Sequence, residues 1–215
     1  MSFFITFEGI EGSGKSTQLL TLGRDLETRG YRVMTTREPG GCPIADAIRA
    51  ILLDPANQAL RPRAELLLYA AARAQHVEQV IRPALAAGTV VLCDRFADAT
   101  TAYQGGGRKL DAGLVAQLNT IATAGLAPDL TLLLDCPVEL GLPRARQRNQ
   151  QDLLQDEGRF ELEELDFHQR VRTAYLALAE CETRFRVVDA TGPVDQVAVR
   201  VSAAVEAFLT ARQRP

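Results

Sequence analysis

The sequence contains no tryptophan and only two histidines, and aromatic residues make up 6 % of its 215 positions. His76 and His168 have no partner at catalytic spacing, and we interpret both as structural. No apolar run approaches the roughly 18 residues of a membrane-spanning helix, and no basic segment precedes an apolar stretch at the start. We therefore expect no membrane partner and a cytoplasmic location.

Cysteine is scarce and scattered. Cys42, Cys93, Cys136 and Cys181 lie far apart and form no Cys-x-x-Cys pair or cysteine–histidine ligand set. This spacing argues against a disulfide framework or a zinc site, and it favours thiols that stay reduced in the cytosol.

The chain also lacks an excess of positive charge, because its formal net charge is -3. Such a balance creates no broad field that would attract nucleic acid, so we expect no nucleic-acid partner and look for local anion sites. The hydrophobic content of 47 % is enough for a large core. The length favours a single domain over residues 1–215.

Lysine is rare as well, and one of the two lysines, Lys15, stands in a phosphate-binding pattern. Residues 9–17, here called the phosphate loop, match Gly-x-x-x-x-Gly-Lys-Ser/Thr between an apolar run and a helix-permissive run. Glycines let backbone N–H groups converge on phosphates, Lys15 can reach the outer phosphates, and the Ser16 hydroxyl can complete a Mg²⁺ shell. The predicted ATP-phosphate residues are Gly9, Ile10, Glu11, Gly12, Ser13, Gly14, Lys15, Ser16 and Thr17.

Apolar runs of strand length alternate with helical patterns along the chain. Near-continuous apolar strands are typical of a parallel sheet covered on both faces, so we predict a three-layer α/β domain. The predicted strands are residues 3–7, 31–36, 89–93, 130–134 and 185–188. The predicted helices include residues 18–29, 44–52, 64–82 with an interruption near Pro83, 111–124 and 194–212. We interpret residues 54–63 as a loop and residues 104–108 as a flexible loop.

Charged residues follow several predicted strands, at the sheet edge where ligands bind. Asp94 ends a buried strand and could hold Mg²⁺ through water beside Ser16, although a helix cap is an alternative. Arg95 indicates a binding site for a second phosphate, because a guanidinium group binds phosphate in a bidentate manner. The predicted reaction is therefore transfer to an acceptor phosphate rather than to water. Arg37 and Arg49 are further clamp candidates, and for Arg49 a solvated helix position is an equal interpretation.

Tyr69 and Arg73 stand four residues apart and share a helix face. The pair could stack on a nucleobase and hydrogen-bond to it, although an ordinary surface cation–π pair is the commoner arrangement. Thr100, Tyr103 and Gln104 follow the Asp94 strand end and could add hydroxyl and amide contacts.

From residue 139 the pattern is helical but polar. We interpret residues 141–161, here called the lid segment, as a solvated flap or an exposed helix that cannot be core. Its arginines are Arg144, Arg146, Arg148 and Arg159.

Motifs in order along nearly the whole chain resemble those of bacterial thymidylate kinases. They lie at residues 7–17, 36–41, 71–73, 94–96 and 102–107. The resemblance implies a P-loop kinase fold: a five-stranded parallel sheet flanked by helices, with a mobile lid. It also implies phosphoryl transfer from ATP with Mg²⁺ to dTMP, giving dTDP, and a homodimer.

The resemblance assigns roles to most of the predicted dTMP residues. Tyr69 would stack on thymine, Arg73 would address its O4 edge, and Tyr103 would lie near the 2′ position. Thr100 and Gln104 would contact the ring. Arg49 and Arg95 would hold the dTMP phosphate, and Glu11 and Glu38 sit where the family places acidic residues near the sugar and phosphates. Arg37 stays a dTMP-binding candidate through its position after a predicted strand.

Some family members carry a catalytic arginine inside the phosphate loop, whereas this chain has Glu11 there. The lid arginines must then supply the positive charge, beside Lys15 and Arg95, and which one acts stays open. The chain also departs from the frequent lid motif Asp-Arg-x-Glu, because residues 158–161 read Gly-Arg-Phe-Glu. Two alternatives to this enzyme remain: another nucleoside monophosphate kinase, and a nucleotide-dependent switch or regulatory ATPase.

Overall fold

The centre of the molecule is a five-stranded, all-parallel sheet with the strand order β2-β3-β1-β4-β5. A computed structural model describes residues 2–151 and 159–213. The strands are β1 (Phe4–Glu8), β2 (Val33–Arg37), β3 (Val90–Asp94), β4 (Leu130–Asp135) and β5 (Phe185–Asp189). All five predicted strands are thus confirmed, with ends shifted by one or two residues.

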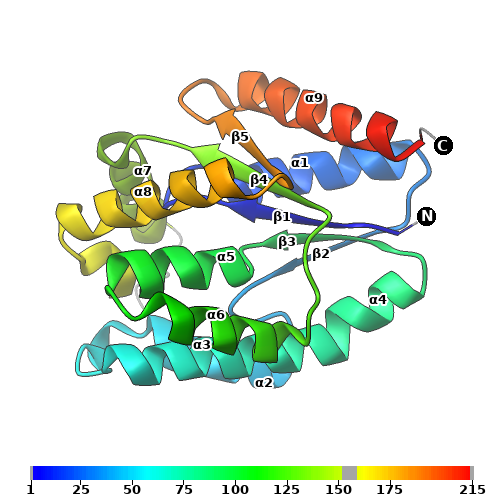
Figure 1. Cartoon of the computed structure of the whole chain (residues 1–215). Helices are drawn as coiled ribbons and strands as arrows, with labels where there is room; N and C mark the ends of the chain where they lie inside the picture. The colour runs from blue at the N-terminus through cyan, green and yellow to red at the C-terminus, as the bar shows by residue number, and fades with distance from the viewer. Residues whose placement is uncertain (1, 152–158, 214–215) are drawn as a thin grey trace.

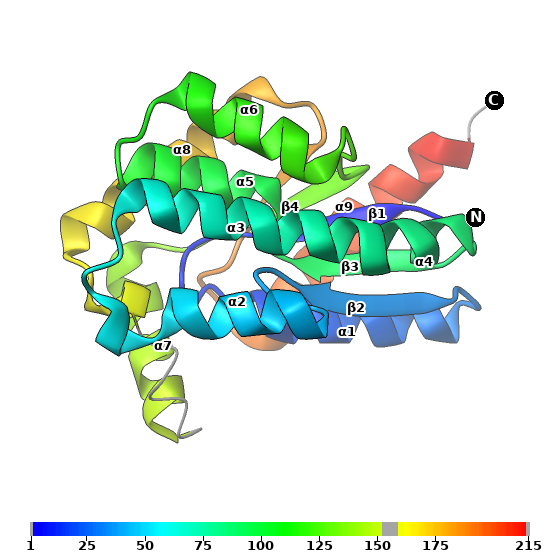
Figure 2. The same ribbon diagram turned by 90° about the horizontal axis from the view of Figure 1, so that it is seen from below.

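Helices cover both faces of the sheet, which makes three layers (Figures 1 and 2). One face carries α1 (Lys15–Thr28) and α9 (Val194–Gln213). The remaining layer and its flanks contain α2 (Pro43–Leu53), α3 (Pro62–His76), α4 (Arg82–Ala86), α5 (Ala97–Thr100), α6 (Ala112–Thr123) and α8 (Leu165–Cys181). Among the described residues, no helix is long and apolar enough to cross a membrane.

The buried side chains of β1 explain this layering. Phe3, Ile5 and Phe7 pack with α1 and α9 in one core cluster, whereas Phe4 packs with Val91 in a cluster on the opposite face. Both faces of the central strands are therefore apolar, which is why their sequences do not alternate with polar residues.

The predicted helix 64–82 is longer than expected and changes geometry along its length. The chain stays helical from α3 through the π-helical segment η2 (Val77–Ile81) into α4, where Pro83 lies in the first turn. A proline has no N–H to donate, and its ring crowds the carbonyl one turn earlier. The wider turn of η2 therefore accommodates Pro83 without ending the helix.

The interpretation of residues 104–108 as a flexible loop is wrong. They belong largely to the π-helical segment η3 (Thr101–Gly107), which continues α5 and packs against α8. A Cβ atom on Gly106 would lie 2.6 Å from the Cβ of Ala174, and one on Gly107 would lie 2.5 Å from the ring of Phe167. The glycines therefore permit close helix packing.

The lid segment begins within α7 (Val138–Gln151) and ends in η5 (Arg159–Leu162); residues 152–158 lie outside the described residues. The expectation that this segment contains no core is wrong, because Leu142, Ala145 and Arg159 are buried.

Helix α7 also starts directly on the phosphate loop. A Cβ on Gly12 would lie 2.0 Å from the carbonyl oxygen of Gly141, so this contact requires glycine.

Candidate active site

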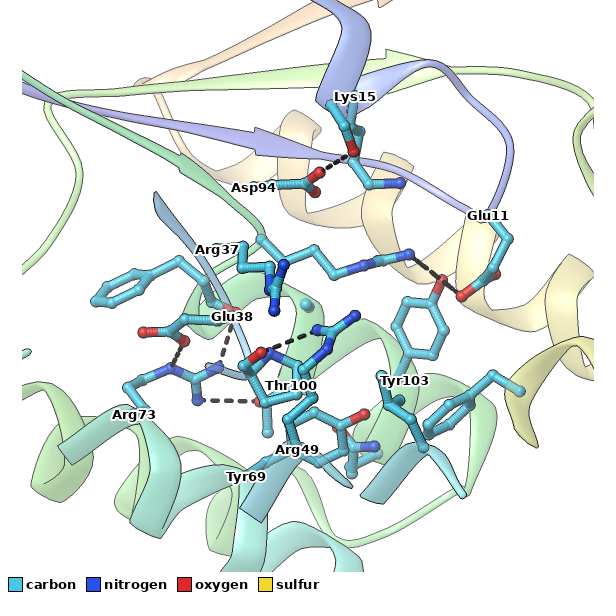
Figure 3. A pocket seen from close by; sticks show the side chains of 18 of the residues that line it. Glu11, Lys15, Arg37, Glu38, Arg49, Tyr69, Arg73, Asp94, Thr100 and Tyr103 are labelled. Atoms are coloured by element: carbon cyan, nitrogen blue, oxygen red, sulfur yellow. Dashed lines mark hydrogen bonds and ion pairs between the residues drawn. The ribbon is translucent and has the colours of Figure 1, made fainter. Parts of the chain in front are cut away.

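A cavity of about 400 Å³ lies at the carboxyl edge of the sheet (Figure 3). Lys15 and Asp94 are at one end of the view, and Tyr69 and Arg73 are at the other. Every residue predicted to bind the acceptor nucleotide lines this cavity: Glu11, Arg37, Glu38, Arg49, Tyr69, Arg73, Arg95, Thr100, Tyr103 and Gln104. The phosphate-loop residues that line it are Glu11, Gly12, Gly14, Lys15, Ser16 and Thr17.

The phosphate loop has the backbone conformation that its glycines allow. Gly9, Gly12 and Gly14 all have positive φ, at 137°, 70° and 90°. The Lys15 Nζ donates to the carbonyls of Gly9 at 3.1 Å and Ile10 at 2.7 Å. Burial, followed by the nearby Arg95 guanidinium, lowers the pKa of Lys15 to about 8.

Ser16, at the start of α1, and Asp94, the last residue of β3, meet at the carboxyl edge of the sheet. Parallel pairing sets Phe7 opposite Asp94, and the Ser16 hydroxyl donates to Asp94 Oδ2 at 2.5 Å. The described residues include no group of three or more acidic, histidine or cysteine side chains that could hold a metal by itself. A hydroxyl and one carboxylate fit Mg²⁺, which keeps several waters and takes further oxygens from phosphates.

Arg95 joins the phosphate loop to the opposite wall of the cavity. Its backbone has a positive φ of 68°, which is uncommon for a residue with a side chain. One terminal nitrogen, Nη1, donates to the Gly9 carbonyl at 3.0 Å and the Tyr175 hydroxyl at 3.2 Å. The other, Nη2, donates to Glu11 Oε1 at 3.2 Å and the Tyr103 hydroxyl at 3.0 Å. The planar fork is therefore held in one orientation.

Glu11 is surrounded by positive charge. Its Oε1 accepts the Tyr103 hydroxyl at 2.6 Å, and its Oε2 lies 3.3 Å from His168 Nδ1, outside hydrogen-bond alignment. Burial opposes ionisation, but His168, Arg95 and Lys15 together hold the pKa of Glu11 well below its usual range. The carboxylate therefore stays charged, and His168 is buried directly beneath the phosphate loop.

Arg73 is a buried arginine of the cavity whose guanidinium group is held by several hydrogen bonds. It is 2 % exposed, and its Nε donates to Glu38 Oε2 at 2.7 Å. Its Nη1 donates to Thr100 Oγ1 at 3.0 Å, and its Nη2 donates to the Phe96 carbonyl at 2.9 Å. A surface cation–π pair with Tyr69 is therefore the wrong alternative, because Arg73 lies inside the protein.

His76 supports this arrangement from behind. Its Nδ1 lies 3.0 Å from Glu38 Oε1, and its Nε2 lies 2.7 Å from Thr36 Oγ1. The structural role predicted for His76 is consistent with this fully buried position. Arg37 and Arg49 reach the same side of the cavity from β2 and α2, and Arg49 donates to the Pro39 carbonyl at 2.9 Å.

The lid arginines occupy different environments. Arg159 is 5 % exposed and donates to Glu65 Oε2 at 2.6 Å and to the Leu52 carbonyl at 2.5 Å. Arg144 is exposed on α7 and lies 3.5 Å from the Ala190 carbonyl. Arg146 is also exposed on α7. Arg148 belongs to α7, but its side chain lies outside the described part of the chain.

A family model described as thymidylate kinase matches residues 7–201. The chain belongs to the thymidylate kinase family. Its relatives include a thymidylate kinase of Geotalea daltonii, 61 % identical over 207 residues, which cover 95 % of this chain and 97 % of the relative. A thymidylate kinase of Trichlorobacter lovleyi is 61 % identical over 203 residues, or 94 % of this chain and 96 % of the relative.

A solved structure agrees with these relatives. The crystal structure of thymidylate kinase from Ehrlichia chaffeensis superposes with a TM-score of 0.76 at 32 % identity, covering 95 % of this chain and 98 % of that one. The sequence-based recognition of the family, the P-loop kinase fold and the kinase activity are therefore confirmed.

Sequence reasoning missed several residues that support the site of this thymidylate kinase family member. Glu8 Oε2 accepts the Tyr175 hydroxyl at 2.7 Å, and that hydroxyl accepts from Arg95. Glu65 and His168 are buried behind the cavity. Glu65 and His168 come from α3 and α8, which are distant in sequence from the phosphate loop. Only Glu8, the last residue of β1, offered a signal, through its position next to the phosphate loop.

Proposed function

We propose that this protein transfers the γ-phosphoryl group of ATP to dTMP, giving dTDP and ADP in deoxythymidine nucleotide biosynthesis. The observation that carries the proposal is a single cavity lined both by the phosphate loop and by a second group of arginines, which we interpret as two anion sites. The phosphate loop occupies one end, and Arg95 stands between that loop and the buried Arg73. A hydrolase needs only the first site, whereas transfer to a nucleotide needs both.

The phosphate loop would hold the ATP phosphates. Its backbone N–H groups and the start of α1 favour negative charge. The Lys15 ammonium now donates to two backbone carbonyls and would exchange them for phosphate oxygens. Because phosphate favours the charged amine, nucleotide binding would raise the pKa of Lys15 from its ligand-free value.

Ser16 and Asp94 would hold Mg²⁺, Ser16 through its hydroxyl and Asp94 through its carboxylate. When bound, the ion would neutralise charge on the transferred phosphoryl group and its oxygens. The 2.5 Å contact between the two side chains supports this role, because both oxygens already face the same point.

The second end of the cavity would hold dTMP. Arg95, Arg49 and Arg37 would clamp its phosphate, because guanidinium groups bind phosphate in a bidentate manner. Tyr69 would stack on the base, while Arg73, Thr100 and Gln104 would contact its edge, as expected from the resemblance. Tyr103 would lie near the sugar, where Glu11 and Glu38 also contribute. The shared cavity lining supports this division of roles.

The transition-state charge would be neutralised by arginines of α7. Arg144, Arg146 and Arg148 are the candidates, because Arg159 is paired with Glu65 inside the protein. The close contact between Gly12 and Gly141 supports this assignment, since α7 starts against the phosphate loop. Arg159 would then fix the far end of the lid segment.

We include in this proposal a cytoplasmic homodimer. The buried free cysteines Cys42, Cys93 and Cys136 suit a reducing compartment, and the resemblance implies the dimer. Sedimentation equilibrium at catalytic concentrations would reveal a monomer if the dimer is wrong.

Substrate profiling tests the proposal. Purified protein with ATP and Mg²⁺ should release ADP only when an acceptor is present, and dTMP should be preferred over dCMP, UMP, GMP and AMP. Equal ADP release without an acceptor would identify a nucleotide hydrolase or switch. A preference for another monophosphate would identify a different nucleoside monophosphate kinase.

A further inference from the structure

Glu65 is a fully buried carboxylate on α3 that does not line the cavity. Its Oε1 accepts from Gln104 Nε2 at 2.8 Å and from Arg108 Nε at 3.2 Å. Its Oε2 accepts from Arg108 Nη2 at 3.2 Å and from Arg159 Nη2 at 2.6 Å. One carboxylate thus connects α3, η3 and η5.

These partners determine which end of the Gln104 amide faces Glu65. Guanidinium groups only donate hydrogen bonds, so both Glu65 oxygens act as acceptors. A carboxylate oxygen repels a carbonyl oxygen, and Gln104 must therefore turn its nitrogen toward Glu65. This assignment follows from chemistry rather than from the near-equal shapes of the amide N and O.

The opposite end of the amide is thereby fixed as well. Gln104 lines the cavity, and within residues 2–151 and 159–213 no donor reaches its Oε1. The carbonyl oxygen is available to a ligand as a hydrogen-bond acceptor. If Glu65 could donate, the amide could turn over and present two donors instead.

We infer that Glu65 is a positioning residue that sets the base preference by locking the Gln104 carbonyl toward the substrate. The inference rests on the proposed function, because it takes the occupant of this end of the cavity to be a pyrimidine base. Thymine and uracil carry an N3–H donor, whereas cytosine has an acceptor at N3. A fixed carbonyl matches the first pair and repels cytosine.

The test compares kcat/KM for dTMP, dUMP and dCMP in wild type and Glu65→Gln. The new amide should keep its oxygen toward Arg159 and the nearer terminal nitrogen of Arg108. Its nitrogen then faces Gln104 and gives up the bond from Arg108 Nε, so that Gln104 can turn over. We expect the dTMP-to-dCMP ratio to fall by at least about tenfold. The dTMP-to-dUMP ratio should stay unchanged, because these bases share N3–H. The ratio of kcat/KM values for two substrates, measured on one enzyme preparation, does not depend on the fraction of the protein that is folded.

Two control variants separate orientation from packing. Arg108→Gln removes a guanidinium partner but leaves the Glu65 carboxylate, and it should keep the wild-type ratio. Glu65→Asp disturbs packing but still only accepts hydrogen bonds, so its dTMP-to-dCMP ratio should stay near wild type even if its activity falls. If Glu65→Gln fails to fold, a collapsed dTMP-to-dCMP ratio in Glu65→Asp would still overturn the inference, because this variant keeps an acceptor-only group at the position.

The outcomes are distinct. A wild-type ratio in folded Glu65→Gln, or a collapsed ratio in Glu65→Asp or Arg108→Gln, would overturn the inference. Wild-type protein that does not prefer dTMP over dCMP would instead overturn the proposed function.

Discussion

Arg159 and Glu65 form an ion pair of 2.6 Å in which both side chains are at least nine-tenths buried. The guanidinium also donates to the Leu52 carbonyl, so its charge is satisfied by fixed protein groups. An arginine held in this way cannot move onto a phosphoryl group without leaving Glu65 with one partner fewer. We therefore assign a structural role to Arg159, in contrast to Arg144 and Arg146, which are exposed on α7.

Replacing Arg159 should affect stability more than chemistry. We expect Arg159→Ala to lower the free energy of unfolding by about 2–3 kcal/mol, because a buried carboxylate loses a charged partner. The kcat of the folded protein should change less than tenfold. Denaturant unfolding and steady-state kinetics on the same samples would check both statements.

Alanine variants at Arg144, Arg146 and Arg148 are the matched comparison. At least one should reduce kcat by a hundredfold or more with an unchanged unfolding midpoint, as expected for a group that acts in the transition state. If Arg159→Ala gave the only large loss of kcat, the assignment to α7 would be wrong. Equal small losses at all positions would mean that the charge is shared.

Adjacent glycines of η3 should differ sharply in their tolerance of alanine. A Cβ on Gly106 would lie 2.6 Å from Ala174, whereas one on Gly105 has no atom within 4 Å. We expect Gly106→Ala to cost about 1–3 kcal/mol of stability through overpacking. Gly105→Ala should be neutral or slightly stabilising. Thermal unfolding of both variants gives the comparison, and equal midpoints would contradict the packing role of Gly106.

Glu8 should make stability depend on pH. Burial, followed by the nearby Asp98 charge, raises the pKa of Glu8 from 4.5 to about 8. Between these values the folded protein holds a proton that the unfolded chain has lost. Stability contributed by the neutral carboxyl is therefore fully present below pH 4.5 and is lost as pH rises toward 8.

Glu8→Gln isolates this effect, because an amide keeps the shape of the neutral carboxyl and does not titrate. Wild type should lose a few kcal/mol, in order of magnitude, relative to Glu8→Gln between pH 5.5 and 8.5. Urea unfolding at both pH values measures the difference. If the free energy of unfolding changed equally with pH in the two proteins, Glu8 would be ionised in the folded state throughout.

The sequence was sufficient for the sheet and for the cavity lining, because both follow from local patterns. Continuous apolar runs specify buried parallel strands, and parallel strands bring their carboxyl ends together. Asp94 and Ser16 could therefore be placed side by side from their positions in the sequence. The same reasoning placed Arg37 and Arg95 at one edge.

Contacts between distant helices could not be predicted in this way. Glu65 and His168 lie in ordinary helical stretches, and their burial depends on how α3 and α8 pack. Arg159 looked like a solvated lid residue because it follows the largely polar stretch 144–157. The glycines of η3 resembled a loop, since close packing and flexibility both favour glycine.

Lys15 and Arg95 should be essential for turnover. Lys15→Ala removes the amine that would meet the ATP phosphates, and Arg95→Ala removes the fork between the two anion sites. We expect each to reduce kcat/KM by at least a hundredfold while circular dichroism stays that of the wild type. Arg95→Lys should rescue little, because an ammonium cannot make the forked contacts to Glu11 and Gly9. Wild-type turnover in either alanine variant would refute the placement of the phosphates.

The Ser16 hydroxyl and the Asp94 carboxylate should govern the magnesium requirement. Ser16→Ala removes one predicted ligand, and Asp94→Asn replaces the charged oxygen beside it. Each should raise the Mg²⁺ concentration needed for half-maximal activity by about tenfold or more, because Mg²⁺ binds few protein ligands and each one matters.

Ser16→Thr is the matched control, since threonine keeps the hydroxyl and also satisfies the phosphate-loop pattern. Magnesium titrations at saturating ATP and dTMP would distinguish these cases. An unchanged magnesium dependence in Ser16→Ala would show that the 2.5 Å contact with Asp94 stabilises the fold and has no part in metal binding.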